Sequence, residues 1–351
     1  MSVPPVNALQ GAIQKLAYRE PLTSDEAQAA FDIVMQGQAS AVQVAALLSA
    51  LRATGESPEV VAGVVRALRN AMVSLSADDP EDLVDTCGTG GGAVSTFNIS
   101  TAAAIVAAGA GVRIAKHGNR SFTSRCGSAD VLEALGVPIE VPLAVMEASL
   151  RDAGIVFMFA PLMHPAMRHV GPVRRELAIP TVMNIVGPLA NPAGVGRQVV
   201  GVADLERAPV LAGALASLGA RHALVVHGEP GLDEVSPLGP THVIEVIDGS
   251  TRRWTIHPEE HGFRKIARED LAGSEPSDNA RIIVEILNGG GPAGARAATV
   301  LNAGAAVYVS GRVKSYADGV EAATKSIDSG EAKSVLDRLK SAYATRPTVR
   351  A

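Results

Sequence analysis

The sequence predicts an α/β protein in which a small, all-helical N-terminal domain precedes a larger α/β domain with a central, mostly parallel sheet. Two observations predict this fold. Helical patterns with their own start and stop signals fill residues 6–75. After a polar break at residues 76–80, short β-like runs alternate with helical stretches, which is typical of a parallel sheet with helices on its faces.

The N-terminal segment reads as four helices. Ser24 is predicted to cap one of them, because two acids follow it in the first turn. The next helix opens at Ser40, has apolar residues at i, i+3, i+4 and i+7, and ends at Gly55. Pro58 begins another helix at the position where a missing N–H costs least. The apolar stripes predict a core in this segment, or one shared with a second copy of the chain.

The larger domain is predicted element by element from the same patterns. Strands are expected at residues 83–87, 112–115, 155–160, 198–202, 223–227 and 243–247. Helices are expected at residues 99–108, 130–135, 143–153 and 205–218, and again from residue 279 onward, ending with 332–344.

Composition excludes several functions. Of the 351 residues, 31 are Lys or Arg and 36 are Asp or Glu, so the net charge of −5 argues against sequence-independent binding to nucleic acid or an anionic membrane. Aromatic residues are 3% of the chain, which argues against a base-stacking surface. The start has no signal-peptide pattern, residues 100–115 are too short to span a bilayer, and two cysteines make no disulfide framework, so a cytoplasmic protein is expected.

A glycine cluster at residues 88–92 separates the first predicted strand of the larger domain from its helix. Glycines at this position let backbone N–H groups approach an anion, and the helix N-terminus adds positive partial charge, so a phosphate-bearing ligand is predicted. One of Asn98, Ser100 and Thr101 is expected to cap the helix. The glycine spacing also satisfies a dinucleotide pattern, but residues 108–119 lack the acid that would bind the ribose.

The second phosphate-binding candidate is the segment 116–130, which combines Lys116 with Gly, Asn and several hydroxyl side chains before a helix that Ser128 is predicted to cap. Both segments follow strands, so they are expected at the same sheet edge. Asp233 and Glu234 follow a later strand and offer hard oxygen ligands for Mg²⁺.

Two other patterns are interpreted as structural. Residues 257–261 fit the zinc-protease pattern H-x-x-E-H, but Pro258 and the glycine that follows prevent the sustained helix which that site needs, so a surface turn is predicted. Cys87 and Cys126 lack the neighbouring base that would activate a thiol, and are expected to be packing residues.

Seven motifs stand in order along nearly the whole chain, and together they resemble the anthranilate phosphoribosyltransferases of tryptophan biosynthesis. They are GTGG at residues 88–91, TFNIST at 96–101, KHGNR at 116–120, GSADVLEALGV at 127–137, FAPLMHPAM at 159–167, VGPLANP at 186–192 and GLDE at 231–234.

This resemblance implies the division into domains and the substrates. Residues 1–78, with a returning helical segment at about 164–192, would form the small domain, through which two subunits form a homodimer, and residues 79–163 and 193–351 would form the larger domain. The substrates would be phosphoribosyl pyrophosphate (PRPP), bound with Mg²⁺ at two ions per subunit, and anthranilate, with no nucleic acid or membrane as partner.

The resemblance also implies roles for individual residues. PRPP would be bound by Gly88, Gly91, Gly92, Thr96, Asn98, Ser100, Thr101, Lys116, Asn119, Thr123, Ser124 and Ser128. Anthranilate would be bound by Gly88, His117, Asn119 and Arg174, and the metal by Ser100, Asp233 and Glu234. No single acid or base is assigned, with His117 as the candidate.

Two segments depart from the family pattern. Gly92-Ala93 stand where the family usually has Asp-Gly, which removes a carboxylate close to the metal and the pyrophosphate. Ala178, Pro180 and Met183 replace family residues on the hinge and acceptor side, so acceptor fit and domain closure are affected. Two alternatives stay open: a pyrimidine-nucleoside phosphorylase, and a non-enzymatic paralogue that binds nucleic acid.

Overall fold

The computed structural model describes residues 7–121, 125–264 and 266–344 of the chain. Its N-terminal part consists of four helices, as the sequence predicts: α1 (Ala8–Ala17), α2 (Ser24–Met35), α3 (Ala41–Thr54) and α4 (Pro58–Asn70). Their starts are fixed by side-chain caps, with Ser40 and Ser57 capping α3 and α4. The prediction for α2 is wrong by one residue, because Thr23 is the cap and Glu26 bonds back to its N–H in a capping box.

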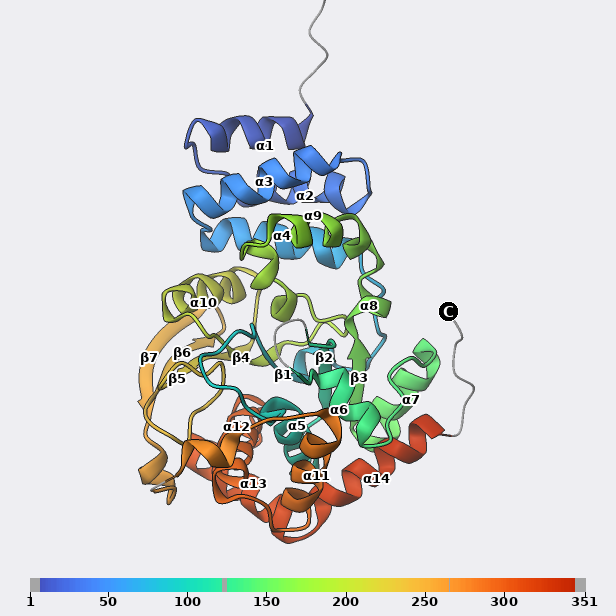
Figure 1. Ribbon diagram of the computed structural model, residues 1–351, viewed down its shortest axis with the longest axis vertical. Helices are drawn as coiled ribbons and strands as arrows, with labels where there is room; N and C mark the ends of the chain where they lie inside the picture. The colour runs from blue at the N-terminus through green and yellow to red at the C-terminus, as the bar shows by residue number, and fades with distance from the viewer. Residues whose placement is uncertain (1–6, 122–124, 265, 345–351) are drawn as a thin grey trace, which may run out of the picture.

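The four helices pack into a bundle that α9 (Gly171–Leu177) joins from later in the chain (Figure 1). Helix α4 lies so close to α2 that a Cβ on Gly63 would overlap the carbonyl oxygen of Ser24. The chain therefore passes between the bundle and the sheet three times. Two backbone hydrogen bonds tie these passages together, from Val73 N to the carbonyl of Met163 (2.8 Å) and from Leu75 N to that of Pro192 (3.0 Å).

A seven-stranded sheet forms the centre of the rest of the molecule, in the order β3-β2-β1-β4-β5-β6-β7. Its first five strands are parallel: β1 (Val84–Gly88), β2 (Ile114–Gly118), β3 (Ile155–Phe159), β4 (Arg197–Gly201) and β5 (His222–Gly228). Strands β6 (Thr241–Ile247) and β7 (Ser250–Ile256) are antiparallel. The strand order reverses between β1 and β4, and α/β proteins collect ligands at the carboxyl ends of strands at such a point.

Strand β7 is absent from the sequence-based expectation. Asp248 and Gly249, both with positive φ, form a two-residue turn that pairs β7 with β6. Strand β2 also differs, because it runs to Gly118 and so contains Lys116 and His117, whereas the strand expected from the sequence ends at residue 115.

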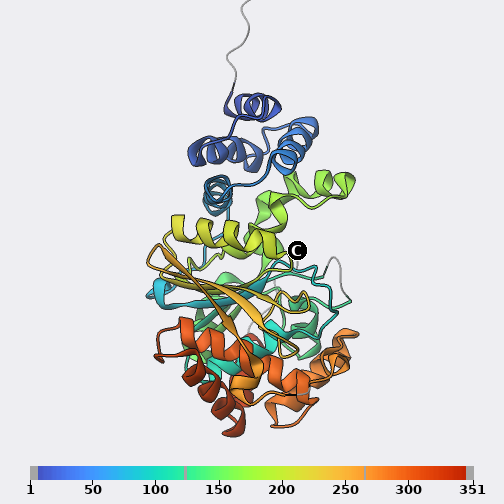
Figure 2. The same cartoon turned by 90° about the vertical axis from the view of Figure 1, so that its left-hand side faces the viewer.

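Helices cover both faces of the sheet, and the described residues form two apolar cores. One core lies between the sheet and the helices α5 (Ile99–Gly109), α6 (Ser128–Ala134), α7 (Leu143–Ala153), α11 (Pro276–Leu287), α12 (Ala293–Val309), α13 (Tyr316–Asp328) and α14 (Glu331–Ala344). The other core lies on the opposite face, where α10 (Ala208–Ser217) separates the sheet from the helical bundle (Figure 2). This second core contains residues of α1 to α4 together with Val200, Val225 and Val246 of the sheet.

Candidate functional site

The loop between β1 and α5 lies at the switch point of the sheet. Gly90 and Gly91 have φ of +71° and +80°, a conformation that side-chain-bearing residues rarely adopt, and the space beside both is open. Gly88 is restricted in another way, because a Cβ there would overlap a carboxylate oxygen of Asp233. The loop thus combines an open side, where a ligand can approach the backbone, with a closed side against Asp233.

Asn98 occupies the N-cap position of α5, but no side chain caps this helix. The expectation that Asn98, Ser100 or Thr101 caps it by a side-chain bond is therefore wrong. The Asn98 amide bonds elsewhere: its Nδ2 donates to the carbonyl of Cys126 (3.1 Å), and its Oδ1 accepts from Nδ2 of Asn279 (3.0 Å). Thr101 Oγ1 is buried without a hydrogen-bond partner. The backbone N–H groups of Ile99, Thr101 and Ala102 bond to backbone carbonyls, and that of Ser100 bonds to Glu234, so α5 offers an anion the positive partial charge of its N-terminus.

Lys116 joins β2 to β1 and α5. Its side chain is 2% exposed, and Nζ donates to the carbonyl of Thr86 and to Oγ of Ser100 (3.2 Å). Thr86 Oγ1 in turn donates to the carbonyl of Ser100 (3.1 Å). The ammonium group is thereby held beside the first turn of α5, and it adds positive charge next to the glycine loop.

His117 follows Lys116 and faces His164, with ring centroids 5.0 Å apart. Both rings are buried, and neither Nε2 has a hydrogen-bond partner. Burial lowers the pKa of His117 to about 3, helped by the nearby His164 and Lys116, and burial lowers that of His164 to about 4. Both imidazoles are therefore neutral at pH 7, and both present an unpaired nitrogen.

Asp85 holds the backbone of His117 in place. It is buried in β1, accepts from the backbone N of His117 (3.2 Å) and from Nδ2 of Asn191 (2.8 Å), and burial raises the pKa of its carboxyl group despite Lys116 nearby. Asn191 also donates to the carbonyl of Ala115 and accepts from Ala193 N. These bonds fix the end of β2 relative to the segment that returns from the helical bundle.

The second phosphate-binding candidate follows β2. Asp130 in the first turn of α6 accepts from Gly127 N (2.8 Å) and Ser121 N (3.3 Å), and pairs with Arg120 (2.8 Å). Gly127 is the N-cap of α6, so the prediction that Ser128 caps it is wrong; Ser128 is the first helical residue. Asn119 lies in this loop, partly exposed, whereas Thr123 and Ser124 fall outside the described residues.

Asp233 and Glu234 lie after β5, opposite the glycine loop. Asp233 Oδ2 accepts from Gly90 N at 2.8 Å, and Gly231 O accepts from Ala93 N at 2.8 Å, so two hydrogen bonds join the two loops. Burial raises the pKa of Asp233. Burial and the charge of Asp233 also raise that of Glu234, against the opposing effects of Lys116 and of a backbone bond from Ser100. The carboxylates of Asp233 and Glu234 repel each other, and Glu234 bonds to the backbone of Ser100, whose side chain carries a hydroxyl group. Their oxygens are hard donors, and a divalent cation bound to them would offset the repulsion.

The remaining candidates are spread more widely. Arg174 lies on α9, partly buried, and burial lowers the pKa of its guanidinium. Ala178, at the end of α9, has a φ of 52°, and Pro180 is exposed, whereas Met183 is buried. Thr96 is partly buried, just before the first turn of α5. The structure therefore brings together the glycine loop, Lys116, His117 and the acid pair, and it places Arg174 on the helical bundle.

Several residues at this site were missed from the sequence. His164, Asp85, Asn191 and Asn279 contact the predicted residues, yet only His164 and Asn191 stand in the motifs quoted above, and neither was assigned a role. A buried acid inside a strand, at Asp85, was a usable signal, since a charge there needs partners. Asn191 and Asn279 carry no such signal, because an isolated asparagine is common in loops and at helix starts.

The patterns interpreted as structural behave as predicted. Residues Pro258–His261 form one short 3₁₀ turn that ends at Gly262, with His257 before it. Burial raises the pKa of Cys87, which is packed beneath the loop, and that of Cys126 to about 11, so neither thiol is activated. Within the described part of the chain, no helix has both the length and the apolar character that crossing a membrane requires.

Comparisons with known proteins agree with this architecture. Residues 80–333 match the model of the glycosyl transferase family a/b domain, and residues 10–72 match that of its helical bundle domain. The chain is 50% identical to an anthranilate phosphoribosyltransferase of Rubrobacter xylanophilus, over 94% of this chain and 96% of that protein.

Solved structures give the same result. The chain resembles the anthranilate phosphoribosyltransferase of Thermus thermophilus with a TM-score of 0.90 and 42% identity, over 95% of this chain and 99% of that one. It also resembles the enzyme of Saccharomyces cerevisiae in complex with PRPP and Mg, with a TM-score of 0.87 and 29% identity, over 96% and 98% of the two chains. The yeast enzyme has also been solved in complex with 4-fluoroanthranilate.

Proposed function

The chain belongs to the anthranilate phosphoribosyltransferase family, and we propose that the strand ends around Gly88, Lys116 and Asp233 form the site of its reaction. In that reaction the phosphoribosyl group of PRPP passes to the amine of anthranilate, which gives N-(5-phosphoribosyl)anthranilate and pyrophosphate. One observation carries the proposal: the glycine loop is bonded directly to the acid pair, through Gly90 N and Asp233 Oδ2 at 2.8 Å. Phosphate-binding backbone and metal-binding carboxylates thereby face one ligand.

The phosphate groups of PRPP bind to the loops after β1 and β2. Gly90 N already donates to Asp233, so the exposed amide of Gly91 and the positive partial charge at the N-terminus of α5 face the anion at the switch point. Lys116 supplies a full positive charge beside them. Thr96 and Asn119 lie in the same two loops, and Ser100, Thr101 and Ser128 lie in the first turns of the helices that follow them, which supports their predicted contacts with the donor.

Mg²⁺ fits the residues present. Asp233, Glu234 and the hydroxyl of Ser100 are hard oxygen donors. Burial raises the pKa of both carboxyl groups, the charge of Asp233 adds to this at Glu234, and a bound cation would offset these effects by stabilising the charged forms. No group of three or more His, Cys, Asp or Glu placed to hold a metal occurs in the described ranges, so the coordination shell needs oxygens from the donor and water. When bound, Mg²⁺ supplies charge stabilisation for the departing pyrophosphate. The proposed number is two ions per subunit.

Anthranilate binds on the side of the site that faces the helical bundle. His117, Asn119 and Gly88 lie at the ends of β2 and β1, and Arg174 lies on α9, which packs on the bundle. The guanidinium of Arg174 pairs with the carboxylate of anthranilate, since a planar guanidinium matches that group. Ala178 ends α9, and Pro180 and Met183 follow it along the chain, so these residues are proposed to affect how the acceptor fits.

The chemistry needs positioning more than proton transfer. The aromatic amine is neutral at pH 7, so its nitrogen attacks C1 of the ribose as the bond to pyrophosphate breaks. Backbone N–H groups and Lys116 stabilise the negative charge that develops on the leaving group. The new ammonium then loses a proton, and His117 is the nearest candidate acceptor, because its buried Nε2 is neutral and unpaired. The amine proton is acidic once the C–N bond has formed, so a weak base suffices.

The subunit is proposed to act as a homodimer in the cytoplasm. Tyr18 and Val42 on the helical bundle are 75% and 78% exposed, the highest values among the large apolar side chains in the described ranges. These two side chains are the apolar surface that the proposed interface would cover. The division into a domain of residues 1–78 plus 164–192 and one of 79–163 plus 193–351 stays a prediction.

The test is a fluorescence assay of anthranilate consumption with PRPP, run with and without Mg²⁺. We expect turnover that requires the metal and is lost when PRPP is replaced by a pyrimidine nucleoside with inorganic phosphate. Robust metal-independent phosphorolysis would instead support the phosphorylase alternative. Tight, salt-sensitive binding to DNA or RNA without turnover would support the nucleic-acid-binding alternative.

A further inference from the structure

Asn279, in the first turn of α11, lies outside every motif on which the proposed site rests. Its side chain is 1% exposed, although α11 begins at the protein surface. Nδ2 donates to Oδ1 of Asn98 (3.0 Å), and Oδ1 accepts from Ser274 N (2.8 Å). Asn98 then donates through its own Nδ2 to the carbonyl of Cys126 (3.1 Å). These bonds form a relay that connects three segments distant in the sequence.

The two backbone groups at the ends of the relay determine how both amides are oriented. Ser274 N–H can only donate, so Asn279 must present its oxygen there and its nitrogen to Asn98. The carbonyl of Cys126 can only accept, so Asn98 must present its nitrogen there and its oxygen to Asn279. Only one orientation of each amide satisfies all the groups. Both polar atoms of the Asn98 amide have a protein partner, so the side chain fixes the position of α5 besides any contact that it makes with the donor.

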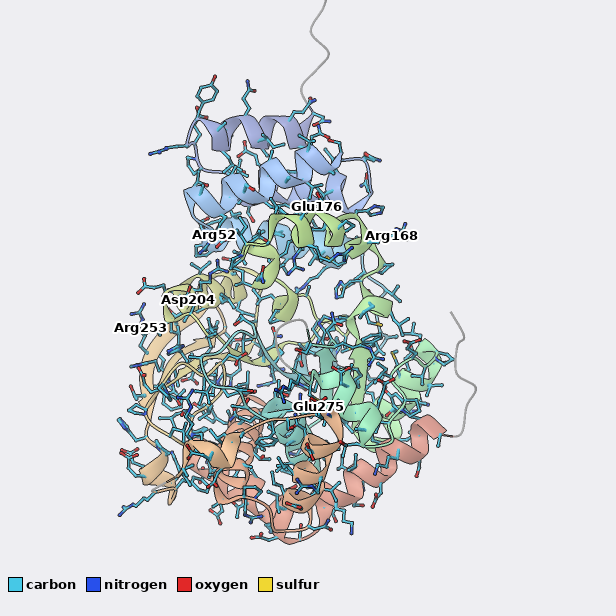
Figure 3. All side chains as sticks on the ribbon, in the orientation of Figure 1. Arg52, Arg168, Glu176, Asp204, Arg253 and Glu275 are labelled. Atoms are coloured by element: carbon cyan, nitrogen blue, oxygen red, sulfur yellow. The ribbon has the colours of Figure 1, made fainter. Side chains whose placement is uncertain are left out.

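The segment before α11 supports the glycine loop at further points. Phe97 N donates to the carbonyl of Leu271 (2.9 Å). A Cβ on Gly273 would overlap the carbonyl of Thr96, so the two backbones are in direct contact. Glu275, labelled in Figure 3 at the start of α11, lies 3.9 Å from Arg125 of the second loop, but both side chains are largely exposed and this pair adds little. The buried contacts between the glycine loop and the loop before α6 are therefore the relay and the bond from Cys126 Sγ to Asn98 Oδ1 (3.2 Å).

We propose that Asn279 is a positioning residue for PRPP binding: it fixes the Asn98 amide, which in turn joins the glycine loop to the loop before α6. The inference rests on the proposed function, since both loops are assigned there to the phosphates of the donor. Backbone N–H groups bind an anion well only when their positions are set beforehand. Loss of the relay frees the two loops to move apart and weakens the binding of PRPP. The binding of anthranilate is unchanged.

The test compares Asn279→Asp and Asn279→Ala with Asn98→Ala and with the double variant Asn98→Ala/Asn279→Ala. Asp is isosteric and keeps the acceptor for Ser274 N, but when ionised it has no hydrogen to donate to Asn98. We expect both Asn279 variants to weaken PRPP binding about tenfold, which is about 1.4 kcal/mol, measured by calorimetry in the presence of Mg²⁺. The KM for anthranilate is expected to change less than about twofold. In the double variant the loss should match that of Asn98→Ala, because Asn279 acts through Asn98.

Ser326→Ala is the matched control. Ser326 is buried and donates to the carbonyl of Val106 (2.8 Å) near the other end of α5, so the variant removes one buried hydrogen bond from the same helix. We expect its PRPP affinity to equal that of the unmodified protein. The proposal is overturned if Asn279→Asp binds PRPP normally, if the two single losses add in the double variant, or if Ser326→Ala weakens binding equally.

A ligand-free measurement separates this inference from the proposed function. Amide hydrogen exchange should become faster at residues 97–102 and 126–131 in Asn279→Asp and stay unchanged there in Ser326→Ala. Unchanged exchange in Asn279→Asp overturns the positioning role. If the unmodified protein forms no product from PRPP and anthranilate, the proposed function fails, and the exchange result still decides whether Asn279 holds the loops.

Discussion

His117 and His164 show how two single residues connect the site to the stability of the chain. Both are neutral in the folded protein, with pKa values of about 3 and about 4, because burial disfavours their charged forms. In the unfolded chain a histidine titrates near pH 6.5. Between these values the unfolded chain binds more protons, so the stability present above pH 6.5 is lost as the pH falls toward 4.

We therefore predict that the free energy of unfolding decreases below pH 6 by about 1.4 kcal/mol per pH unit for each of these histidines. His164→Gln removes one titrating group, so its unfolding free energy should fall less steeply than that of the unmodified protein in urea titrations from pH 7 to pH 4.5. His257→Gln, at a side chain that is 40% exposed, is the control and should leave the slope unchanged. Equal slopes for all three proteins would show that the imidazole of His164 is not kept neutral by burial.

Among single residues, the sequence predicts those that stand in short motifs, and it misses those whose partners lie far away along the chain. Lys116 and the acid pair are recognisable because phosphate and metal chemistry require their types beside glycine loops. Asn279 contacts Asn98 across 181 positions, and nothing in its immediate neighbours indicates that partner. The cap assignments at Ser24 and Ser128 are wrong for a simpler reason. In each case the preceding residue, Thr23 or Gly127, is also of a type that favours the N-cap position.

Strand β6 illustrates how one element depends on a buried charge. Glu245 is fully buried and accepts hydrogen bonds from His222 (2.8 Å), Arg252 (2.6 Å), Trp254 (2.8 Å) and Tyr308 (2.9 Å). Burial opposes ionisation, yet the bonds from His222 and Arg252 outweigh it and lower the pKa of Glu245 to about 2. Two of the donors belong to β7, so this carboxylate attaches the edge strand to the sheet.

Glu245→Gln should therefore destabilise the protein by about 2 kcal/mol, because it replaces charge-assisted hydrogen bonds and leaves one donor facing an amide N–H. Thermal unfolding gives the size of the loss, and hydrogen exchange should become faster at residues 250–256. Glu229→Gln, at a carboxylate that is 49% exposed, should change neither measurement. A Glu245→Gln protein with normal protection in β7 would contradict this role.

The same cluster explains why β7 escaped prediction. Its residues are mostly exposed, so the alternation that reveals a half-buried strand is absent, and its stability comes from Glu245 on the neighbouring strand. Helices α1 to α4 were predictable because their caps and apolar spacing are local properties. The Asp248-Gly249 turn was a usable local signal for the hairpin, since this dipeptide is typical of two-residue turns between antiparallel strands.

At the scale of the whole molecule, the proposed homodimer rests on the outer surface of the helical bundle. Val42→Glu and Tyr18→Glu should each shift the protein toward monomer in light scattering after gel filtration, because a charge buried in an apolar interface is costly. Val284→Glu is the control on α11, where the valine is 39% exposed, and it should leave the mass unchanged. An unmodified protein that is already monomeric at assay concentrations would contradict the proposal.

The core that runs from α1 to α4 through α10 into the sheet sets a limit on how this chain can be divided. The boundary between the two family matches, between residues 72 and 80, is not a boundary of the apolar core. Val200, Val225 and Val246 of the sheet pack in the same core as residues of α1 to α4. Two fragments made by dividing the chain between residues 72 and 80 would each expose apolar surface to water. Catalysis would then return only by complementation, when the two pieces are synthesised together and close that interior around α10.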